Sequence, residues 1–257
     1  MAYGKVYICG AGPGDPGLLT VKAAGLLKTC GVVLYDRLVS TDIISQVSPG
    51  ALKIYVGRAV GDPTTHQEET NRKMVEYAKQ GLSVLRLKGG DPFIFGRGAE
   101  EAEYLVENGI EFEIVPGISS AVGSATYAGI PLTHRSYASS VSIVTGHEEE
   151  GKKDSASSVN WSMLAKATDT IVVLMGIGQL EQISRELVSS GRKASTPVAI
   201  VENGTTPSQR TVTGTLENIA SVAARSGVKP PAIIVIGDVV SVRGRIGGWF
   251  REKVDGA

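Results

Sequence analysis

The sequence predicts an α/β protein with two domains, on three observations. Short apolar runs alternate with amphipathic stretches through the first half of the chain, a pattern typical of a parallel sheet covered by helices. The pattern changes from about residue 141 onward. With 257 residues and 42% apolar content, the chain is long enough for two modest cores. We expect one domain over residues 1–118, a second over 119–245, and a tail over 246–257.

In the first half, apolar runs of strand length end in polar or glycine-rich residues, and stretches with helical spacing lie between them. The expected strands are residues 6–9, 32–35, 54–56, 83–87 and 112–115. The expected helices are residues 18–28, 67–79 and 99–107.

The helical stretch 119–127 leads into the second half of the chain. The strands expected there are residues 141–145, 170–175, 197–201, 209–215 and 232–236. Two further helices are expected over residues 179–190 and 216–226.

The composition argues against several classes of protein. Twenty-six basic residues balance 26 acidic ones, so no net charge attracts the chain to nucleic acid or to a membrane surface. The only cysteines, Cys9 and Cys30, cannot form a metal site alone and are interpreted as reduced packing residues. Residues 1–6 contain no signal-peptide apolar region, so we expect a cytoplasmic protein.

A glycine-rich loop follows the first predicted strand. Residues 12–17 match the pattern G-x-G-x-x-G, and Asp36 ends the next strand about twenty residues on, as in NAD-binding folds. Pro13 and Pro16, however, remove backbone N–H donors where a pyrophosphate would bind. An NAD-dependent oxidoreductase therefore stays a remote alternative.

Three loops follow strands of the predicted parallel sheet, at residues 36–37, 88–92 and 116–120. Because ligands bind at the carboxyl ends of parallel strands, we expect these loops to meet at one edge of the sheet. Adjacent glycines let a ligand lie directly against the main chain. The pattern suits a zwitterionic or cationic ligand with an adenosine end, such as a sulfonium cofactor.

Seven segments together make the chain recognisable: residues 6–16, 34–39, 86–98, 115–118, 128–135, 145–147 and 202–205. In this order and spacing they closely resemble the uroporphyrinogen-III C-methyltransferases, a family of S-adenosylmethionine-dependent tetrapyrrole methyltransferases. The resemblance runs from about residue 4 to 245. It implies two α/β domains of the tetrapyrrole methyltransferase type, with the cofactor in the cleft between them, and a homodimer.

The implied activity is methyl transfer from S-adenosylmethionine to carbons 2 and 7 of uroporphyrinogen III, without a metal. The products are S-adenosylhomocysteine and precorrin-2, a precursor of sirohaem and cobalamin. A methyltransferase acting on a later precorrin is the nearer alternative. The family's cofactor contacts map onto Pro13, Gly89, Gly90, Asp91, Ile94, Ser119, Ser120, Met175 and Gly204.

The substrate that the resemblance implies is a polycarboxylate, and arginine is the natural bidentate partner of a carboxylate. Within the matched segments, we expect Arg37, Arg97 and Arg135 to bind it.

The family's proposed proton acceptor maps to Asp36, and Glu100, one helical turn after Arg97, is a second candidate. Arg58 replaces the family's proposed proton-donating lysine. Because arginine stays protonated, we expect charge pairing from it.

Overall fold

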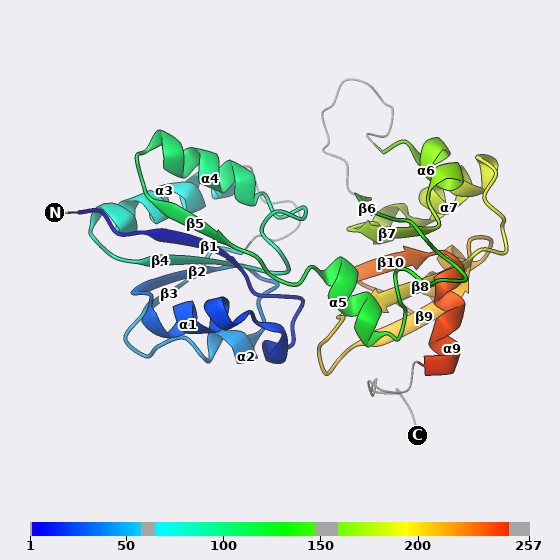
Figure 1. The fold of residues 1–257 in the computed structure, drawn as a ribbon, viewed down its shortest axis with the longest axis horizontal. Helices are drawn as coiled ribbons and strands as arrows, with labels where there is room; N and C mark the ends of the chain where they lie inside the picture. The colour runs from blue at the N-terminus through cyan, green and yellow to red at the C-terminus, as the bar shows by residue number, and fades with distance from the viewer. Residues whose placement is uncertain (1, 58–64, 147–158, 247–257) are drawn as a thin grey trace. The chain divides into compact units, whose positions relative to one another are not determined.

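A computed structural model describes residues 2–57, 65–146 and 159–246 (Figure 1). The chain folds into two compact units, Met1–Ser120 (unit 1) and Ala121–Ala257 (unit 2). The division follows Ser120, whereas the sequence placed it after residue 118. Among the described residues, no helix combines the length and the apolar character needed to cross a membrane.

Unit 1 is built on a five-stranded sheet in which every neighbouring pair is parallel. Its strands are β1 (Val6–Gly10), β2 (Val32–Tyr35), β3 (Leu52–Tyr55), β4 (Val84–Lys88) and β5 (Phe112–Val115). Their order across the sheet is β3-β2-β4-β1-β5. This confirms the five strands predicted for the first half, each within two residues.

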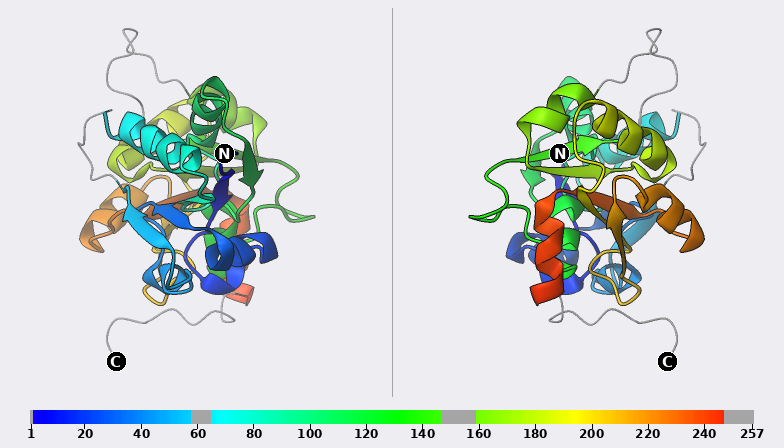
Figure 2. Two further views of the ribbon diagram at one scale, coloured as in Figure 1. Left: turned by 90° about the vertical axis from the view of Figure 1, so that its left-hand side faces the viewer. Right: turned by 90° about the vertical axis from the view of Figure 1, so that its right-hand side faces the viewer.

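Helices cover both faces of this sheet (Figure 2). On one face lie α1 (Val21–Thr29) and α2 (Thr41–Ile44), and on the other α3 (Thr65–Lys79) and α4 (Gly98–Glu107). A single 3₁₀ turn, η1 (Pro16–Leu18), lies within the glycine-rich loop. Because side chains alternate along a strand, Leu85 and Leu87 of β4 pack toward α1, and Val84 packs toward α3 and α4.

Unit 2 contains a second five-stranded sheet of mixed direction. Its strands are β6 (Val141–Thr145), β7 (Thr170–Leu174), β8 (Pro197–Glu202), β9 (Arg210–Thr215) and β10 (Ala232–Ile236). In the order β6-β7-β10-β8-β9, only the β6–β7 pair is parallel. The five strands predicted for the second half are therefore confirmed.

One face of this second sheet packs against α5 (Ser120–Tyr127) and η3 (Asp238–Val242). The other face packs against α6 (Trp161–Ala167), α7 (Leu180–Ser189) and α8 (Ile219–Arg225), with η2 (Ile177–Gln179) before α7. The short helix α9 (Arg243–Ile246) follows η3, and Arg243 donates to the carbonyl of Ala128, just after the end of α5. The sequence did not predict α2, α6 or α9, because a helical period does not show in so few residues.

Candidate functional site

Three loops at one edge of the unit 1 sheet meet through glycines, which we call the glycine junction: Gly10, Gly90 and Gly117. A Cβ atom built on Gly117 would lie 2.3 Å from the carbonyl oxygen of Gly90 and 2.7 Å from the Cα of Gly10. A Cβ on Gly10 would lie 2.5 Å from the same oxygen. Only glycine allows the main chains to approach this closely. The predicted meeting of the loops at residues 88–92 and 116–120 is confirmed, but the third contact comes from Gly10 at the end of β1 and not from the predicted loop at residues 36–37.

Hydrogen bonds hold the junction together. The Gly12 N–H donates to the Gly90 carbonyl at 3.1 Å, and the Gly90 N–H donates to the Gly12 carbonyl at 2.8 Å. The carboxylate of Asp91 accepts from the Phe93 N–H at 2.8 Å and from the Gly117 N–H at 3.0 Å. Asp91 therefore links the loop after β4 to the loop after β5.

The junction leaves main-chain groups available beside it. In the described part of the chain, neither the N–H nor the C=O of Gly89 has a hydrogen-bond partner, although a Cβ there would lie 2.8 Å from the Cβ of Leu38. The nearby side chain of Ile94 is 40% exposed. Backbone donors and acceptors beside an apolar side chain fit a zwitterionic ligand with an adenosine end better than a bare pyrophosphate.

Strained backbone occurs in the same motifs. Among the described residues, those other than glycine with positive φ angles are Phe95, Arg97, Met175, Asn203 and Thr205. Such residues cost about 1–3 kcal/mol each and concentrate at functional sites. All of them lie within or next to segments that the sequence assigned to cofactor or substrate binding.

Unit 2 has a similar close approach of main chains at the end of β7. A Cβ on Gly146 would lie 2.4 Å from the Cα of Gly176. Next to Gly176, Met175 has a φ angle of 56° and a side chain that is 52% exposed. Gly204 is tightly packed, because a Cβ there would lie 2.1 Å from the hydroxyl oxygen of Ser124 on α5. That both units contribute to one cofactor site stays a prediction.

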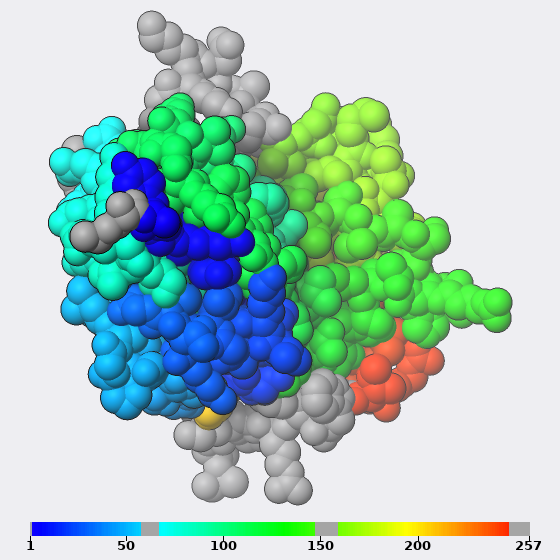
Figure 3. All heavy atoms as spheres, turned by 60° about the vertical axis from the view of Figure 1, so that its left-hand side comes forward, coloured from blue at the N-terminus to red at the C-terminus, as the bar shows by residue number. Residues whose placement is uncertain are grey.

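The three arginines predicted to bind substrate are all exposed. Arg37 and Arg97 follow β2 and β4, which are neighbours in the sheet of unit 1. Arg97 pairs with Glu100, with Nη2 and Nε at 2.5 and 2.6 Å from its Oε2. Arg135 lies in unit 2 on the turn bridged by His134 and Ala138, which projects from the surface (Figure 3).

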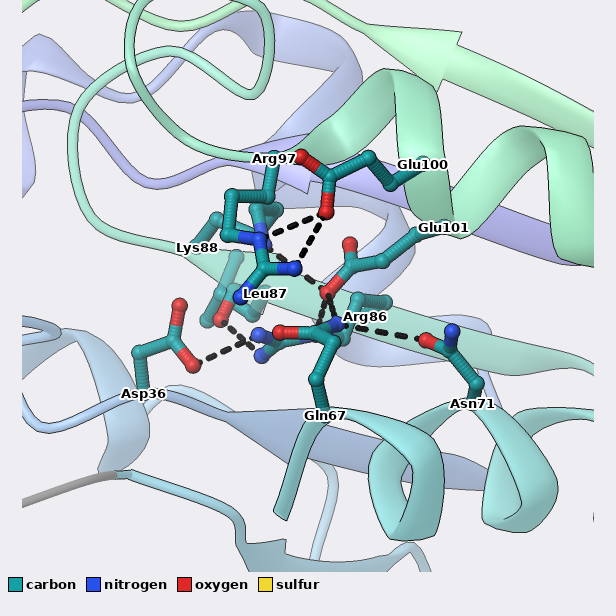
Figure 4. A network of polar contacts seen from close by, with 9 residues as sticks. All are labelled: Asp36, Gln67, Asn71, Arg86, Leu87, Lys88, Arg97, Glu100 and Glu101. Carbon is teal, nitrogen blue, oxygen red and sulfur yellow. Dashed lines mark hydrogen bonds and ion pairs between the residues drawn. The ribbon is translucent and has the colours of Figure 1, made fainter. Parts of the chain in front are cut away.

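Asp36 is partly exposed and contacts a group of three buried charged residues, Arg86, Lys88 and Glu101 (Figure 4). We call these four residues together the buried charge cluster. Arg86 Nη2 lies 2.6 Å from Asp36 Oδ1, and Arg86 Nε lies 3.0 Å from Glu101 Oε1. Lys88 Nζ donates to the same Glu101 oxygen at 2.9 Å. Gln67 Nε2 also donates to it, at 3.0 Å.

Burial and charge act against each other in this cluster. Arg86 and Lys88 are each 3% exposed and Glu101 is 0% exposed. Burial opposes ionisation of Glu101, but the charges of Arg86 and Lys88 outweigh it and lower its pKa. Burial, followed by the positive charge of Arg86, lowers the pKa of Lys88. Burial also opposes the charge of Arg86, yet Glu101 and Asp36 together raise its pKa.

Sequence reasoning found Asp36 but missed Arg86, Lys88 and Glu101. A signal was present, because Arg86 and Lys88 are two positions apart in a buried strand and so point to one face. That face packs against α3 and α4, so two cations there require a buried acidic partner. Arg58 lies outside the described residues.

Fold and site together define a small-molecule-binding α/β protein, whose ligand region is formed by glycine-rich loops at the carboxyl ends of strands. Residues 5–220 match the model of the Tetrapyrrole (Corrin/Porphyrin) Methylases. The chain belongs to this family.

Named proteins are similar to this chain along most of its length. A Methanosarcina barkeri protein named S-adenosyl-L-methionine-dependent uroporphyrinogen III methyltransferase is 50% identical over 245 residues, covering 95% of both chains. A siroheme synthase of Thiobacillus denitrificans is 48% identical over 255 residues, which are 99% of this chain but 52% of that protein. The chain thus spans about half the length of the siroheme synthases that it matches.

Solved structures are similar over most of the chain. The uroporphyrin-III C-methyl transferase of Thermus thermophilus, in complex with S-adenosylhomocysteine, has a TM-score of 0.78 and 40% identity and covers 93% of this chain. The match covers 94% of that chain. A cobalt precorrin-4 methyltransferase has a TM-score of 0.80 and 32% identity, with 92% of this chain and 95% of the other covered.

Proposed function

We propose that the chain transfers methyl groups from S-adenosylmethionine to carbons 2 and 7 of uroporphyrinogen III, giving precorrin-2 and S-adenosylhomocysteine. The observation that carries the proposal is the 50% identity to a relative named for this methyltransferase, along 95% of both chains. The main chain beside the glycine junction supports it, because the N–H and C=O of Gly89 have no hydrogen-bond partner in the described part of the chain and fit the cofactor.

For the cofactor, we assign main-chain contacts to Pro13, Gly89 and Gly90, with Ile94 as an apolar neighbour. Asp91 fixes the two loops that form this region, through its hydrogen bonds to Phe93 and Gly117. The remaining assigned positions are Ser119, Ser120, Met175 and Gly204. When bound, S-adenosylmethionine supplies an electrophilic methyl group on a sulfonium leaving group.

For the substrate, we assign carboxylate binding to Arg37, Arg97 and Arg135. Exposed guanidinium groups can form paired hydrogen bonds with carboxylates at little desolvation cost. Glu100 already holds Arg97 from one side, which limits the directions from which a substrate carboxylate can approach it. Arg58 is proposed to add a further charge contact.

For the proton, we assign Asp36 as the acceptor. Oδ1 is held by Arg86, while Oδ2 has no partner in the described part of the chain and the side chain is 27% exposed. When the methylated tetrapyrrole loses its proton, the C–H bond breaks and its electron pair returns to the π system. The carboxylate oxygen takes the proton, and Glu100 is the alternative acceptor.

We further propose that the chain acts as a cytoplasmic homodimer, which the resemblance to the family supports. The product would then serve sirohaem synthesis, cobalamin synthesis or both. The names of two relatives support this, a siroheme synthase and a cobalt precorrin-4 methyltransferase.

The test is anaerobic incubation with uroporphyrinogen III and methyl-labelled S-adenosylmethionine, followed by mass spectrometry of the tetrapyrrole. We expect a gain of two labelled methyl groups, strongly reduced in Arg97→Ala and retained in Arg72→Ala, which removes an exposed arginine on α3. An unmethylated tetrapyrrole would refute the proposed substrate.

One observation favours a second candidate, a methyltransferase acting on a later precorrin. The cobalt precorrin-4 methyltransferase matches the fold as well as the Thermus enzyme does, although at lower identity. Methylation of a later precorrin, with none of uroporphyrinogen III, would establish this candidate in place of the first.

A further inference from the structure

The buried charge cluster contains more charge than the fold of unit 1 needs. Replacing a buried ion pair by apolar residues of similar volume is often neutral or stabilising. The surrounding core shows that apolar packing is available here, because Val84 on the same face of β4 packs with Met74 and Leu105. Two cations at positions 86 and 88 of this strand therefore call for an explanation other than stability.

The two carboxylate oxygens of Glu101 also differ in their hydrogen bonding. Glu101 Oε1 accepts from Arg86, Lys88 and Gln67, whereas its buried Oε2 has no partner within the described residues. A buried polar atom without a partner costs about 1–3 kcal/mol. The arrangement thus favours one set of contacts, those that fix Arg86, over complete satisfaction of Glu101.

The guanidinium of Arg86 joins two carboxylates through different nitrogens. Nε points to Glu101, which is fully buried, and Nη2 points to Asp36, which is partly exposed. A third nitrogen, Nη1, donates to the Leu87 carbonyl at 3.4 Å. Glu101 and the strand therefore set the orientation of Arg86, and Arg86 sets the position of Asp36 (Figure 4).

We propose that Arg86 and Glu101 are positioning residues for Asp36. Glu101 anchors the guanidinium, which holds Oδ1 of Asp36 so that Oδ2 faces the substrate. This inference rests on the proposed function, in which Asp36 accepts the proton. A lysine at position 86 keeps the charge but has a single nitrogen, which cannot reproduce the fork between two carboxylates.

The test is a double-mutant cycle of Arg86→Lys and Asp36→Asn, with kcat, KM for uroporphyrinogen III and the Kd of S-adenosylhomocysteine measured for each variant. We expect Arg86→Lys alone to lower kcat by about 10- to 100-fold, as a small misplacement of a reacting group does. KM should change less than about 3-fold and Kd less than about 2-fold. In the Asp36→Asn background, Arg86→Lys should lower kcat less than about 2-fold, because Arg86 and Asp36 act as a unit.

The matched control is Arg72→Lys, the same substitution at an exposed position of unit 1, which should leave all three constants unchanged. Equal losses of kcat with and without the Asp36 carboxylate would overturn the proposal, as would a weakened Kd. If the wild-type chain methylates no uroporphyrinogen III, the proposed function fails and this inference fails with it. Additive losses in an active enzyme refute the positioning role alone.

A second measurement does not depend on whether Arg86→Lys folds. In Asp36→Ala, the intact Arg86 fork faces a partly exposed space that formate can enter. We expect formate to restore activity at least about 10-fold, whereas chloride at equal ionic strength restores none. Absence of rescue by formate would count against an anchored carboxylate site.

Discussion

Replacing Gly117 by alanine tests whether the glycine junction forms the cofactor site. The added Cβ would lie 2.3 Å from the Gly90 carbonyl oxygen, whereas ordinary contact begins at 3.4 Å. The loops must therefore separate by about 1.1 Å (3.4 − 2.3). Overpacking of this kind typically costs about 1–3 kcal/mol, and the hydrogen bond from Gly117 to Asp91 is weakened as well. We expect a total loss of about 3 kcal/mol.

The assays are urea denaturation and calorimetric titration with S-adenosylhomocysteine. Besides the loss of stability, we expect the Kd to rise at least 10-fold, which corresponds to about 1.4 kcal/mol, because the loop glycines can no longer present their main chain together. Gly25→Ala is the matched control. Position 25 lies inside α1, and nothing lies within 4 Å of the added Cβ. The free energy of unfolding of Gly25→Ala should therefore rise by about 0.5–1 kcal/mol, with an unchanged Kd for S-adenosylhomocysteine. A Gly117→Ala protein with the stability and Kd of the wild type would refute this reasoning.

Three further predictions concern stability and reactivity. Glu101→Gln should lower the free energy of unfolding by about 3–5 kcal/mol at pH 7. Because the pKa of Glu101 is lowered in the folded protein, the stability that the Glu101 carboxylate contributes is present above the ordinary pKa of 4.5 and is lost as the pH falls through the pKa of the folded protein. Urea titrations in which Glu101→Gln loses the same free energy of unfolding at pH 7 and at low pH would contradict this prediction. Burial raises the pKa of Cys9 to about 12 and also raises that of Cys30, so iodoacetamide at pH 8 should alkylate neither before denaturant is added, as mass spectrometry can check. Thr20→Ala should cost about 1 kcal/mol in thermal or chemical melts, since the Thr20 hydroxyl accepts from the Ala23 N–H at the start of α1; an unchanged melt would show that this cap contributes nothing.

The sequence by itself determined the strands and most of the longer helices, because each has a hydrophobic period that local side chains create. It also determined that the loops after β4 and β5 meet, since parallel strands place their carboxyl ends at one edge, whereas the structure showed that Gly10 of β1 completes the glycine junction. Asp36 was recognised in this way, at the end of a strand and in a matched motif. Short helices such as α2 and α6 were missed, because they fit their surroundings without a readable period of their own.

Only the tertiary structure shows which charged residues lie next to Asp36. Glu101 is separated from Arg86 by 15 positions, and Asp36 from Arg86 by 50, so no local pattern connects them. Their contact depends on the pairing of β2 with β4 and on the packing of α4 against that sheet. Periodicity can show which face a side chain occupies, but only the assembled core shows which charge lies opposite, and that opposite charge makes burial of Arg86 possible.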